Sequence, residues 1–325
     1  MKPLLIFGVS LTLFSVIFIG VYAKTKITVS KKNMSPDDVY YFQDNTIVHE
    51  QIELQSSLLF FYTSRIGKFL RPLFTKQYLC HLLGWYQDSS FSKRAIAPFI
   101  KTHEITMDDF IIPEGGYTSF NDFFCRKLKP GARSIDAHHI VSPADCKLYI
   151  IEDISADSVF FVKQKPFNLA KFLNNPTLAH EYEHGTLIIF RLAPYDYHRF
   201  HFPVDCTPSK PQPINGIYES VNPLVYRSGV QPLTENERHL IMLTTEHHGN
   251  IAMLSVGALF VGKIIETYTP EVPCKKGDET GYFAFGGSTV VLLFKKNTIK
   301  PQQIFLDHSR QGLETAVKMG QAITE

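Results

Sequence analysis

A serine, two histidines and an aspartate lie in three separate segments of the sequence and could together carry out nucleophilic chemistry. A serine hydroxyl is a weak nucleophile unless a nearby base takes its proton, and a carboxylate can orient that base. The order of acid, base and serine along the chain is compatible with such a triad but does not prove one. The candidates are Asp145 in Ser142-Pro-Ala-Asp145, His198 and His201 in Tyr197-His-Arg-Phe-His201, and Ser288 in Gly286-Gly-Ser-Thr289.

The segment around Ser288 predicts two strands joined by a tight turn. Aromatic and small residues alternate over 282–285, and β-branched and apolar residues fill 289–294. Gly286 and Gly287 let the backbone bend where a residue with a β-carbon would clash, which leaves a carbonyl exposed beside the serine hydroxyl. On these residues alone, an ordinary hairpin is the simpler interpretation.

The two histidines are three positions apart, so their relative direction depends on the local backbone. In a strand this spacing sends the side chains to opposite faces, whereas a turn or a helical segment brings them to one side. Pro194 and Pro203 bracket the segment and permit a turn. With a carboxylate partner, one histidine could act as an oriented base while the other moves protons. Taken alone, two histidines here are more often ordinary polar or core residues.

A second pattern, His180-Glu-Tyr-Glu-His184, fits the H-E-x-x-H spacing of zinc hydrolases. On a helix it would place His180 and His184 on one face as zinc ligands, with Glu181 as general base. Such a helix would be short, and a third ligand would have to come from elsewhere, for example from Asp205. A solvated polar turn before the next strand is the simpler interpretation. We therefore expect no metal site and keep a zinc metallohydrolase as the alternative function.

The composition indicates a folded protein with a full core and gives no sign of nucleic-acid binding. The chain has 325 residues, 44% of them hydrophobic and 20% charged, which allows one large or two ordinary domains. The net charge is only +2 and no long basic block occurs, so no nucleic-acid partner is expected. The five cysteines are scattered and never form a C-x-x-C pair, which argues against a disulfide framework or a cysteine zinc site.

Residues 1–23 predict a transmembrane anchor or a secretory signal segment. The run from Pro3 to Ala23 carries no charge, and at about 1.5 Å per residue it is long enough to cross a bilayer core of roughly 30 Å. A signal peptide is the alternative, because Val21-Tyr-Ala23 could serve as its cleavage site, but the run is long for one. Lysines after the run outnumber those before it, which by the positive-inside rule leaves the body of the protein on the cytoplasmic side. A signal peptide would instead direct the body along the secretory route.

The next segments predict a linker and then helices that suit a membrane interface. Residues 24–46 are polar and are typical of a linker. The region 47–110 is expected to be helical, with apolar helices at 57–74 and 76–86 that contain interspersed Arg and Lys, and a further helix at 92–110. Cations beside large aromatic side chains suit amphipathic helices that lie in the interface. A helical hairpin packed on its own domain is an equal alternative.

The body of the chain, residues 111–325, predicts an α+β fold that is β-rich and largely antiparallel. The strand–helix alternation of parallel sheets is missing from the sequence. Helices are expected only at 167–173 and from 302 onward, and the sequence contains no internal repeat. The expected strands are 140–141, 147–151, 159–162, 186–191, 239–244, 251–256, 264–268, 282–285 and 289–294.

Over about residues 55–325 the chain resembles the phosphatidylserine decarboxylase family. The segments R-L-A-P-Y-D-Y-H-R-F-H at 191–201 and G-S-T at 287–289 are highly specific in this order and spacing. Cys146, Cys206 and Gly286 depart from residues common in the family, which affects local turns and leaves the chemistry intact. The other similar segments are 119–133, 142–145, 234–238, 256–258, 261–262 and 276–283.

The resemblance implies a proenzyme that cuts itself between Gly287 and Ser288. Asp145 would orient His201, and His201 would take the proton of Ser288, whose oxygen attacks the Gly287 carbonyl. Ser288 would then become a pyruvoyl group, the covalent cofactor of the family. This group would begin a small chain, 288–325, and the residues up to Gly287 would form the large chain.

The activity that the resemblance implies is that of a pyruvoyl-dependent carboxy-lyase. The pyruvoyl ketone forms a Schiff base with the amine of phosphatidylserine and accepts electrons as CO2 leaves, giving phosphatidylethanolamine. His198 is the implied proton donor in this step. The expected partners are phosphatidylserine in a membrane and the protein's own two chains, and a homodimer is also considered. A lipid substrate implies a membrane-associated protein and gives the helices before residue 110 a purpose.

Overall fold

The computed structural model describes residues 34–35, 38–50, 52, 55–76, 84–155, 167–259, 263–284, 286 and 288–325. The predicted anchor or signal segment at 1–23, the predicted strand at 159–162 and Gly287 lie outside these residues. Within the described ranges, none of the helices has the length and apolar character needed to cross a bilayer.

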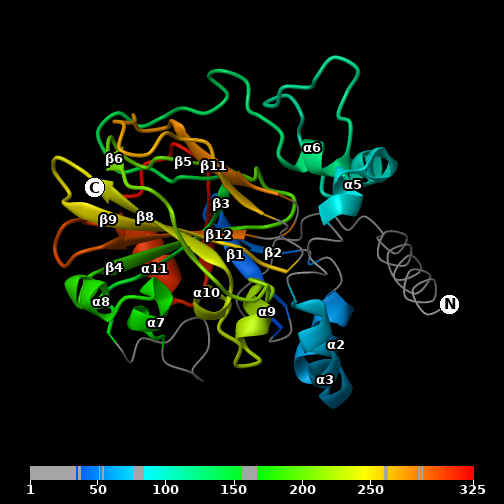
Figure 1. The fold of residues 1–325 in the computed structure, drawn as a ribbon, viewed down its shortest axis with the longest axis horizontal. Coiled ribbons are helices and arrows are strands. Elements are labelled where there is room, and N and C mark those ends of the chain that lie inside the picture. Colours follow the sequence, from blue (N-terminus) through cyan, green and yellow to red (C-terminus); the bar gives the residue numbers. More distant parts are fainter. Residues whose placement is uncertain are drawn as a thin grey trace.

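A large sheet forms the centre of the molecule, and Ser288 begins one of its inner strands (Figure 1). In the described part of the chain it has ten strands in the order β2-β1-β13-β3-β4-β12-β9-β8-β6, and β7 also pairs with β8. Paired strands run antiparallel except for β1 and β13, which are parallel. The strands are β1 Tyr40–Gln43, β2 Thr46–His49, β3 Cys146–Ile151, β4 Thr186–Leu192, β6 Thr207–Pro208, β7 Gln212–Ile214, β8 Arg238–Thr244, β9 Asn250–Val256, β12 Ser288–Phe294 and β13 Glu314–Val317.

A second sheet carries the histidine segment and packs on one face of the large sheet. Its three strands, in the order β10-β11-β5, are β10 Ile264–Glu266, β11 Glu279–Phe283 and β5 Arg199–His201. Phe200 of β5 and Phe283 of β11 belong to the same buried cluster as Phe190 of β4 and Leu292 of β12. This shared core places the strand that bears the histidines against the sheet that bears Ser288.

Both faces of β12 are covered, which explains its unbroken apolar sequence. Side chains alternate between the two faces of a strand. Val290 and Leu292 join the core shared with the small sheet, whereas Val291 and Leu293 join a second buried cluster on the opposite face. Every residue of β12 is buried, so Ser288 starts from a strand that is held between β4 and β9 and shielded on both sides.

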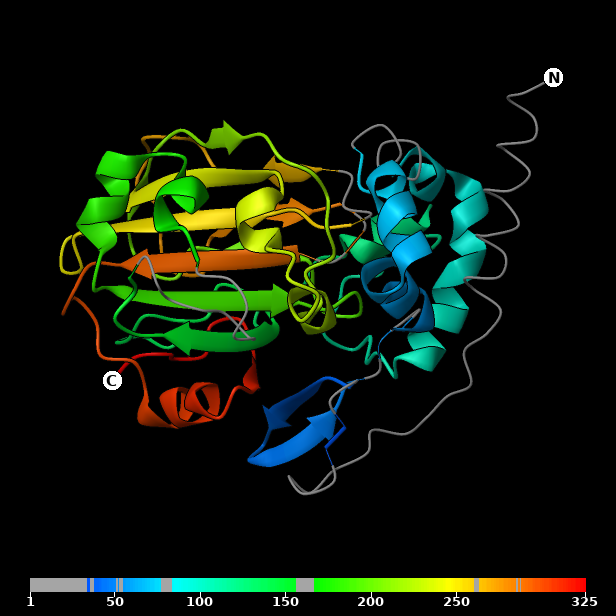
Figure 2. The same ribbon diagram turned by 90° about the horizontal axis from the view of Figure 1, so that it is seen from below.

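The helices form two groups. Figure 2 shows α2, α3, η2 and α5 gathered at one end of the sheets, whereas α7, α8 and α11 lie against the sheets themselves. The bounds are α2 Gln55–Thr63, α3 Arg65–Phe74, η2 Ser90–Ala95, α5 Ile96–Thr102, α6 Phe120–Phe124, α7 Leu169–Leu173, α8 Pro176–Tyr182, α9 Pro223–Tyr226, α10 Pro232–Glu235 and α11 Gln303–Arg310.

The sequence predicts most of these elements, with specific failures. The α+β class, the antiparallel sheet and five of the expected strands are confirmed: 147–151, 186–191, 239–244, 251–256 and 289–294. The strands expected at 264–268 and 282–285 are confirmed in part, because β10 ends at Glu266 and β11 ends at Phe283. The helix expected over 92–110 is wrong beyond Thr102, because Glu104 adopts the left-handed conformation with φ 50°. The strand expected at 140–141 is wrong as well, since Val141 forms only an isolated bridge to Ala322.

The helical pair α2–α3 is fastened to the body by one buried carboxylate. Tyr62 of α2 donates a 2.6 Å hydrogen bond to Glu219, and Arg71 of α3 forms a 3.2 Å ion pair with the same side chain. The side chain of Asn236 holds the Glu219 backbone through its N–H and its carbonyl. The helix expected over 57–74 is thus divided at Ser64 into α2 and α3, and this face of the pair packs on the body, whereas most of the helix expected at 76–86 lies outside the described residues.

The first two strands tie the start of the described chain to the end of it. Strand β1 lies within the stretch expected to be a linker, and it pairs with β13 near the C-terminus. Glu50, just after β2, and Glu314 of β13 both form ion pairs with the buried Arg191 of β4. The end of the expected linker is thus part of the sheet, because it contains three consecutive aromatic residues, Tyr40, Tyr41 and Phe42, whose side chains are all buried.

Candidate functional site

Ser288 lies at the first position of β12 with its hydroxyl buried and unused. Its Cα lies opposite that of Leu192 in β4, and the side chain is fully buried. Oγ has no hydrogen-bond partner among the described residues. A buried hydroxyl without a partner costs free energy and usually marks a functional position. Two residues earlier, Gly286 has φ 135°, a conformation that side chains with a β-carbon rarely adopt.

His198 lies just before β5 and presents one free ring nitrogen. Nδ1 lies 3.0 Å from the carbonyl oxygen of Asp196, so the neutral ring carries its proton on Nδ1 and its lone pair on Nε2. The ring packs on Phe124, with 3.8 Å between ring centroids. Nε2 is buried and has no partner in the described part of the chain. Burial, assisted by the charge of Arg126, lowers the pKa of His198 well below its ordinary value, so the resting ring is neutral.

His201, the last residue of β5, has both ring nitrogens engaged. Nδ1 lies 2.9 Å from the Gly277 carbonyl oxygen, and Nε2 accepts a 3.1 Å hydrogen bond from the hydroxyl of Tyr197. Burial lowers the pKa of His201, although the Gly277 carbonyl and the charges of Glu279 and Asp145 oppose this effect. The resting ring is a neutral base whose lone pair is covered by Tyr197.

The backbone of the histidine segment is extended, which settles the direction of the two rings. Arg199 to His201 pair with β11, and the Phe283 N–H continues the ladder to the carbonyl of His198. At a spacing of three in extended backbone, the side chains leave on opposite faces. Their neighbours agree, since His198 contacts Phe124 and His201 contacts Tyr197.

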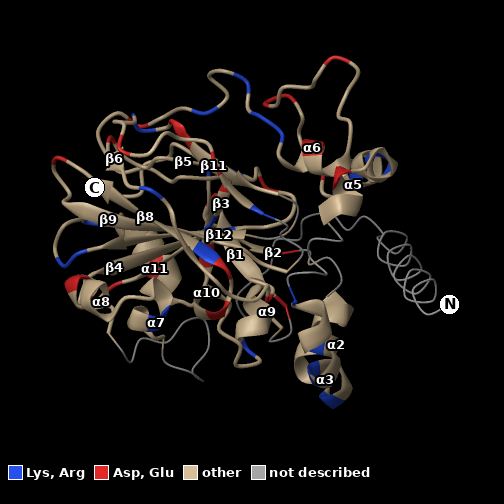
Figure 3. Cartoon of the chain, in the orientation of Figure 1, with Lys and Arg blue, Asp and Glu red and all other residues tan. Residues whose placement is uncertain are grey.

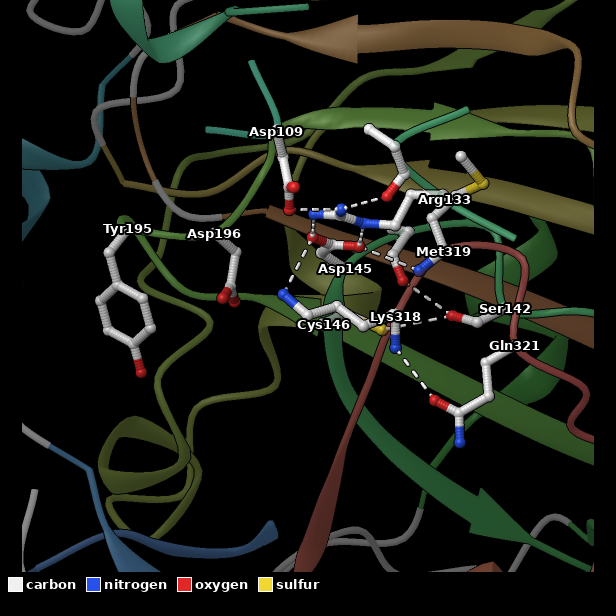
Figure 4. A network of polar contacts seen from close by, with 12 residues as sticks. Asp109, Arg133, Ser142, Asp145, Cys146, Tyr195, Asp196, Lys318, Met319 and Gln321 are labelled. Atoms are coloured by element: carbon white, nitrogen blue, oxygen red, sulfur yellow. Dashed lines mark hydrogen bonds and ion pairs between the residues drawn. The ribbon is translucent and has the colours of Figure 1, made fainter. Parts of the chain in front are cut away.

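Asp145 is the centre of a network of cationic and backbone donors (Figure 4). Arg133 grips both carboxylate oxygens, with Nε 3.0 Å from Oδ1 and Nη2 2.7 Å from Oδ2. The amine of Lys318 and the backbone N–H of Met319 also donate to this carboxylate, and Asp109 binds the far side of Arg133. Burial alone would raise the pKa of Asp145, but the hydrogen bond from Arg133 and the charge of Lys318 lower it overall. Asp145 is therefore ionised at neutral pH.

The predicted acid, base and nucleophile do not form a hydrogen-bonded triad in this structure. Within the described residues, Asp145 makes no hydrogen bond to His201, and Ser288 makes none to either histidine. His201 is oriented by Gly277 and Tyr197, and Asp145 affects it only through its charge. In this structure the charge of Asp145 therefore acts on His201, but the two side chains would have to move before they could form a hydrogen bond.

Sequence reasoning missed the residues that hold this site together. Tyr197 covers His201, Arg133 grips Asp145, and Arg126 donates to the carbonyl that also binds His198. Each of them lies inside a segment that resembles the family, and this is the only signal that could have singled them out. Their partners lie 4, 12 and about 70 positions away along the chain, so spacing alone does not reveal them.

The zinc alternative has no support in the geometry. Helix α8 does begin at the predicted cap, because the Asn175 side chain accepts from the N–H of Leu178, but it ends at Tyr182. His184 lies beyond the helix in the left-handed conformation, so it does not share a helical face with His180. The polar side chains of the pattern bind Glu183, Lys295 and Asp153 instead. Across the described ranges, no three His, Cys, Asp or Glu residues could together hold a metal ion.

The comparisons with known proteins point to one family. The family profile described as phosphatidylserine decarboxylase matches residues 120–325, which include all four candidate residues. A phosphatidylserine decarboxylase proenzyme of Chlamydia pneumoniae is 42% identical over 284 residues, which span 85% of this chain and 93% of that protein. Proteins of the same name from Chlamydia trachomatis and Fusobacterium nucleatum are 41% and 40% identical, and each alignment covers 89% of this chain and 98% of the relative.

Proposed function

The chain belongs to the phosphatidylserine decarboxylase family, and we propose that it releases the carboxyl group of phosphatidylserine as CO2 to give phosphatidylethanolamine. The observation that carries this function is the match over nearly the full length of relatives that bear this name. The same name, proenzyme, points to a chain that is processed before it acts.

We infer that processing is a self-cleavage between Gly287 and Ser288. Ser288 Oγ attacks the preceding carbonyl, its proton passes to a base, and the resulting ester eliminates to release the large chain with a carboxylate end. The dehydroalanine left at position 288 is then hydrolysed with loss of ammonia, which gives the pyruvoyl group. A buried hydroxyl without a partner supports this role, because it is already desolvated and no hydrogen bond has to be broken before it attacks. His201 is the proposed base, and its neutral resting state leaves it able to accept the proton.

Asp145 supports His201 in this step through its negative charge. A fixed anion nearby favours the protonated imidazole, so it stabilises the state that forms when Ser288 loses its proton. Arg133 keeps Asp145 ionised for this purpose. Since Tyr197 covers the lone pair of His201, its hydroxyl has to turn away or accept the serine proton itself before the base can act.

The fold explains how the two chains stay together after the cut. Residues 288–325 contribute β12, which lies between β4 and β9, and β13, which lies between β1 and β3. All four neighbouring strands belong to the large chain. Two strands of the small chain are therefore held within a sheet of the large chain, and their backbone hydrogen bonds do not depend on the cleaved peptide bond.

The residues around Ser288 fit a pyruvoyl group formed from that serine. Once formed, this group supplies a carbonyl that draws off the electrons left behind when CO2 departs. His198 has the properties required of the proton donor to the substrate carbon, because its Nε2 is buried, unpaired and fixed in direction by the bond from Nδ1.

We propose that the helical pair α2–α3 brings this site to the membrane. Ile66, Phe69 and Leu73 recur at helical spacing along α3 and are all exposed, and Phe69 is 82% exposed. Arg65 and Lys68 are also exposed on this helix, and Figure 3 marks cationic residues along it. An apolar stripe with flanking cations suits the boundary between acyl chains and lipid phosphates. An anchor or signal segment at residues 1–23, and a position of the body on the cytoplasmic side of the membrane, remain predictions from the sequence.

The function is tested with purified protein and phosphatidylserine in mixed micelles. CO2 release together with a small chain of residues 288–325, blocked at its N-terminus, is the expected result. A Glu181→Ala variant and a chelator should change neither outcome, because the residues that the structure describes offer no group of ligands for zinc. Active protein that remains a single uncut chain would contradict the pyruvoyl mechanism, and cut protein without CO2 release would contradict the substrate.

A further inference from the structure

Arg126, just after α6, is a buried cation that forms no ion pair with any carboxylate of the described residues. Its guanidinium carbon lies 4.4 Å from the ring centroid of Phe110 and 4.9 Å from that of Phe123. Nη2 donates to the carbonyl oxygens of Tyr195 and Asp196 at 3.0 and 3.1 Å. Nε and Nη1 have no partner in the described part of the chain. Burying a guanidinium this way is costly, so its position calls for a reason beyond packing.

Arg126 and His198 bind the same atom. The Asp196 carbonyl oxygen accepts from Nη2 of Arg126 and from Nδ1 of His198, at 3.1 and 3.0 Å. Phe124, two positions before Arg126, packs its ring on the imidazole. The segment 124–126 thus holds His198 in two ways. Phe124 packs on the face of its ring, and Arg126 holds the carbonyl oxygen that accepts from Nδ1–H.

We propose that Arg126 is a positioning residue for decarboxylation, which holds His198 through the shared Asp196 carbonyl so that Nε2 addresses the substrate carbon. This inference rests on the proposed function, in which His198 delivers the proton. The reaction consumes one proton for each CO2 released, so His198 takes a proton from solvent on Nε2, passes it to the carbon and returns to the neutral ring. A ring that could turn about its own axis would present Nδ1 instead and lose the transfer.

The charge of Arg126 also affects the pKa of His198. The charged groups that act on the ring are Arg126 and Lys147 of β3, and the Asp196 carboxylate is bound by Lys147 at 2.7 Å. Of these two cations, the charge of Arg126 has the larger effect on the imidazole. It lowers the pKa of His198 in addition to the effect of burial. Arg126 therefore makes the protonated ring a stronger acid toward the substrate carbon.

Simple anchoring of the segment does not account for Arg126. Arg199 already donates to the Cys125 carbonyl at 2.9 Å, and the Cys125 thiol lies 3.5 Å from the carbonyl oxygen of Phe283. Phe123 and Phe124 are fully buried in addition. The segment has its own attachments, and Arg126 adds contacts to the turn that leads into His198.

Two substitutions at position 126 and one elsewhere test the proposal. Arg126→Gln removes both the charge and the guanidinium, whereas Arg126→Lys keeps a charge and loses the geometry of two fixed donors. Arg238→Gln is the matched control, because Arg238 is also buried, also donates only to backbone carbonyls, and also has a pKa lowered by burial to about 10. Arg238 is not among the groups that act on His198. Self-cleavage, thermal unfolding and the pH dependence of CO2 release are measured for each variant.

We expect both Arg126 variants to self-cleave and to lose roughly 10- to 100-fold in the limiting rate of CO2 release. The inflection at which activity falls with rising pH should move to higher pH in Arg126→Gln and stay near that of the wild type in Arg126→Lys. An unmoved inflection in both variants, or the same rate loss in Arg238→Gln, would overturn the proposal. If Arg126→Gln does not fold, the proposal is decided by Arg126→Lys, in which a full limiting rate would contradict it. Failure of the unaltered enzyme to release CO2 would instead contradict the proposed function.

Discussion

The hydroxyl of Tyr197 donates a 3.1 Å hydrogen bond to Nε2 of His201, and the two rings lie nearly parallel at 5.8 Å. Nδ1 of the same imidazole is held by the Gly277 carbonyl oxygen. The only lone pair with which His201 can act as a base is therefore covered in the uncut chain. Two outcomes are open to the proton of Ser288: it reaches His201 after Tyr197 moves, or it passes through the tyrosine hydroxyl.

Replacing Tyr197 by phenylalanine distinguishes these outcomes. If the hydroxyl only covers the base, Tyr197→Phe frees Nε2 and removes a donor that favours the neutral ring, so self-cleavage should be at least as fast as in the wild type. We expect this result. The rate is followed as the conversion of precursor to two chains on a denaturing gel. Cleavage slowed about 100-fold or more would show that the hydroxyl relays the proton.

Ser288→Ala and His201→Ala should each leave a single uncut chain. The first removes the attacking oxygen, and the second removes the base that the weak serine nucleophile requires. Both variants should still bind vesicles, since the two residues lie on β5 and β12 and not on α2 or α3. A Ser288→Ala protein that was still cut between 287 and 288 would refute self-cleavage by this serine.

His198→Ala should separate processing from catalysis. The processed chains should appear as in the wild type, whereas CO2 release should fall by roughly 100- to 10,000-fold, the usual contribution of a general acid. The structure makes this a sharp test, because Nε2 of His198 has no partner among the described residues, whereas Nε2 of His201 is engaged by Tyr197. If the His198→Ala chain remained uncut, we would conclude that His198, and not His201, is the base for self-cleavage.

The sequence singles out Asp145, His198, His201 and Ser288 as candidates, but it does not predict how their side chains are held. A run such as β12 is readable because both of its faces are buried and its residues are uniformly apolar. Strands β1 and β13 cannot be predicted in this way, since they lie toward the edge of the sheet and their pairing joins residues about 270 positions apart. In the same way, the histidine spacing is ambiguous until β5 pairs with β11. Hydrogen bonds from Arg133 and Tyr197 depend on this tertiary arrangement.

Arg133→Met should destabilise the protein and raise the pKa of Asp145. It leaves a buried carboxylate with only Lys318 and the Met319 N–H as donors. Breaking a buried ion pair by removing one partner costs about 3 kcal/mol, to be measured as the free energy of unfolding in denaturant. Self-cleavage should also slow, because a protonated Asp145 no longer stabilises a charged His201. A matched control is Arg310→Met, which removes an exposed ion pair with Glu152 and should cost less than about 1 kcal/mol.

The ion pair of Asp145 also predicts a dependence of stability on pH. Its pKa in the folded protein lies below the ordinary value of 3.8, so its contribution to stability is complete above that value. The contribution is lost as the pH falls from about 3.8 through the lower folded pKa, because the unfolded chain binds the proton first. In an Asp145→Asn variant the unfolding free energy should vary less with pH over this acidic window. If the unfolding free energies of the two proteins changed equally with pH, the pKa of Asp145 would not be lowered in the folded protein.

Phe69→Ser on α3 should weaken binding to vesicles that contain phosphatidylserine without loss of fold. The side chain is 82% exposed, so the substitution removes little buried surface from the protein itself. Withdrawing one aromatic side chain from the acyl region should cost about 2 kcal/mol, or roughly 30-fold in affinity, measured by co-sedimentation. Val272→Ser is the control, since Val272 is an exposed apolar residue in the loop before Cys274 and belongs to neither α2 nor α3. If the two variants bind equally well, the α3 stripe does not contact lipid, and its exposed apolar residues must face a different partner.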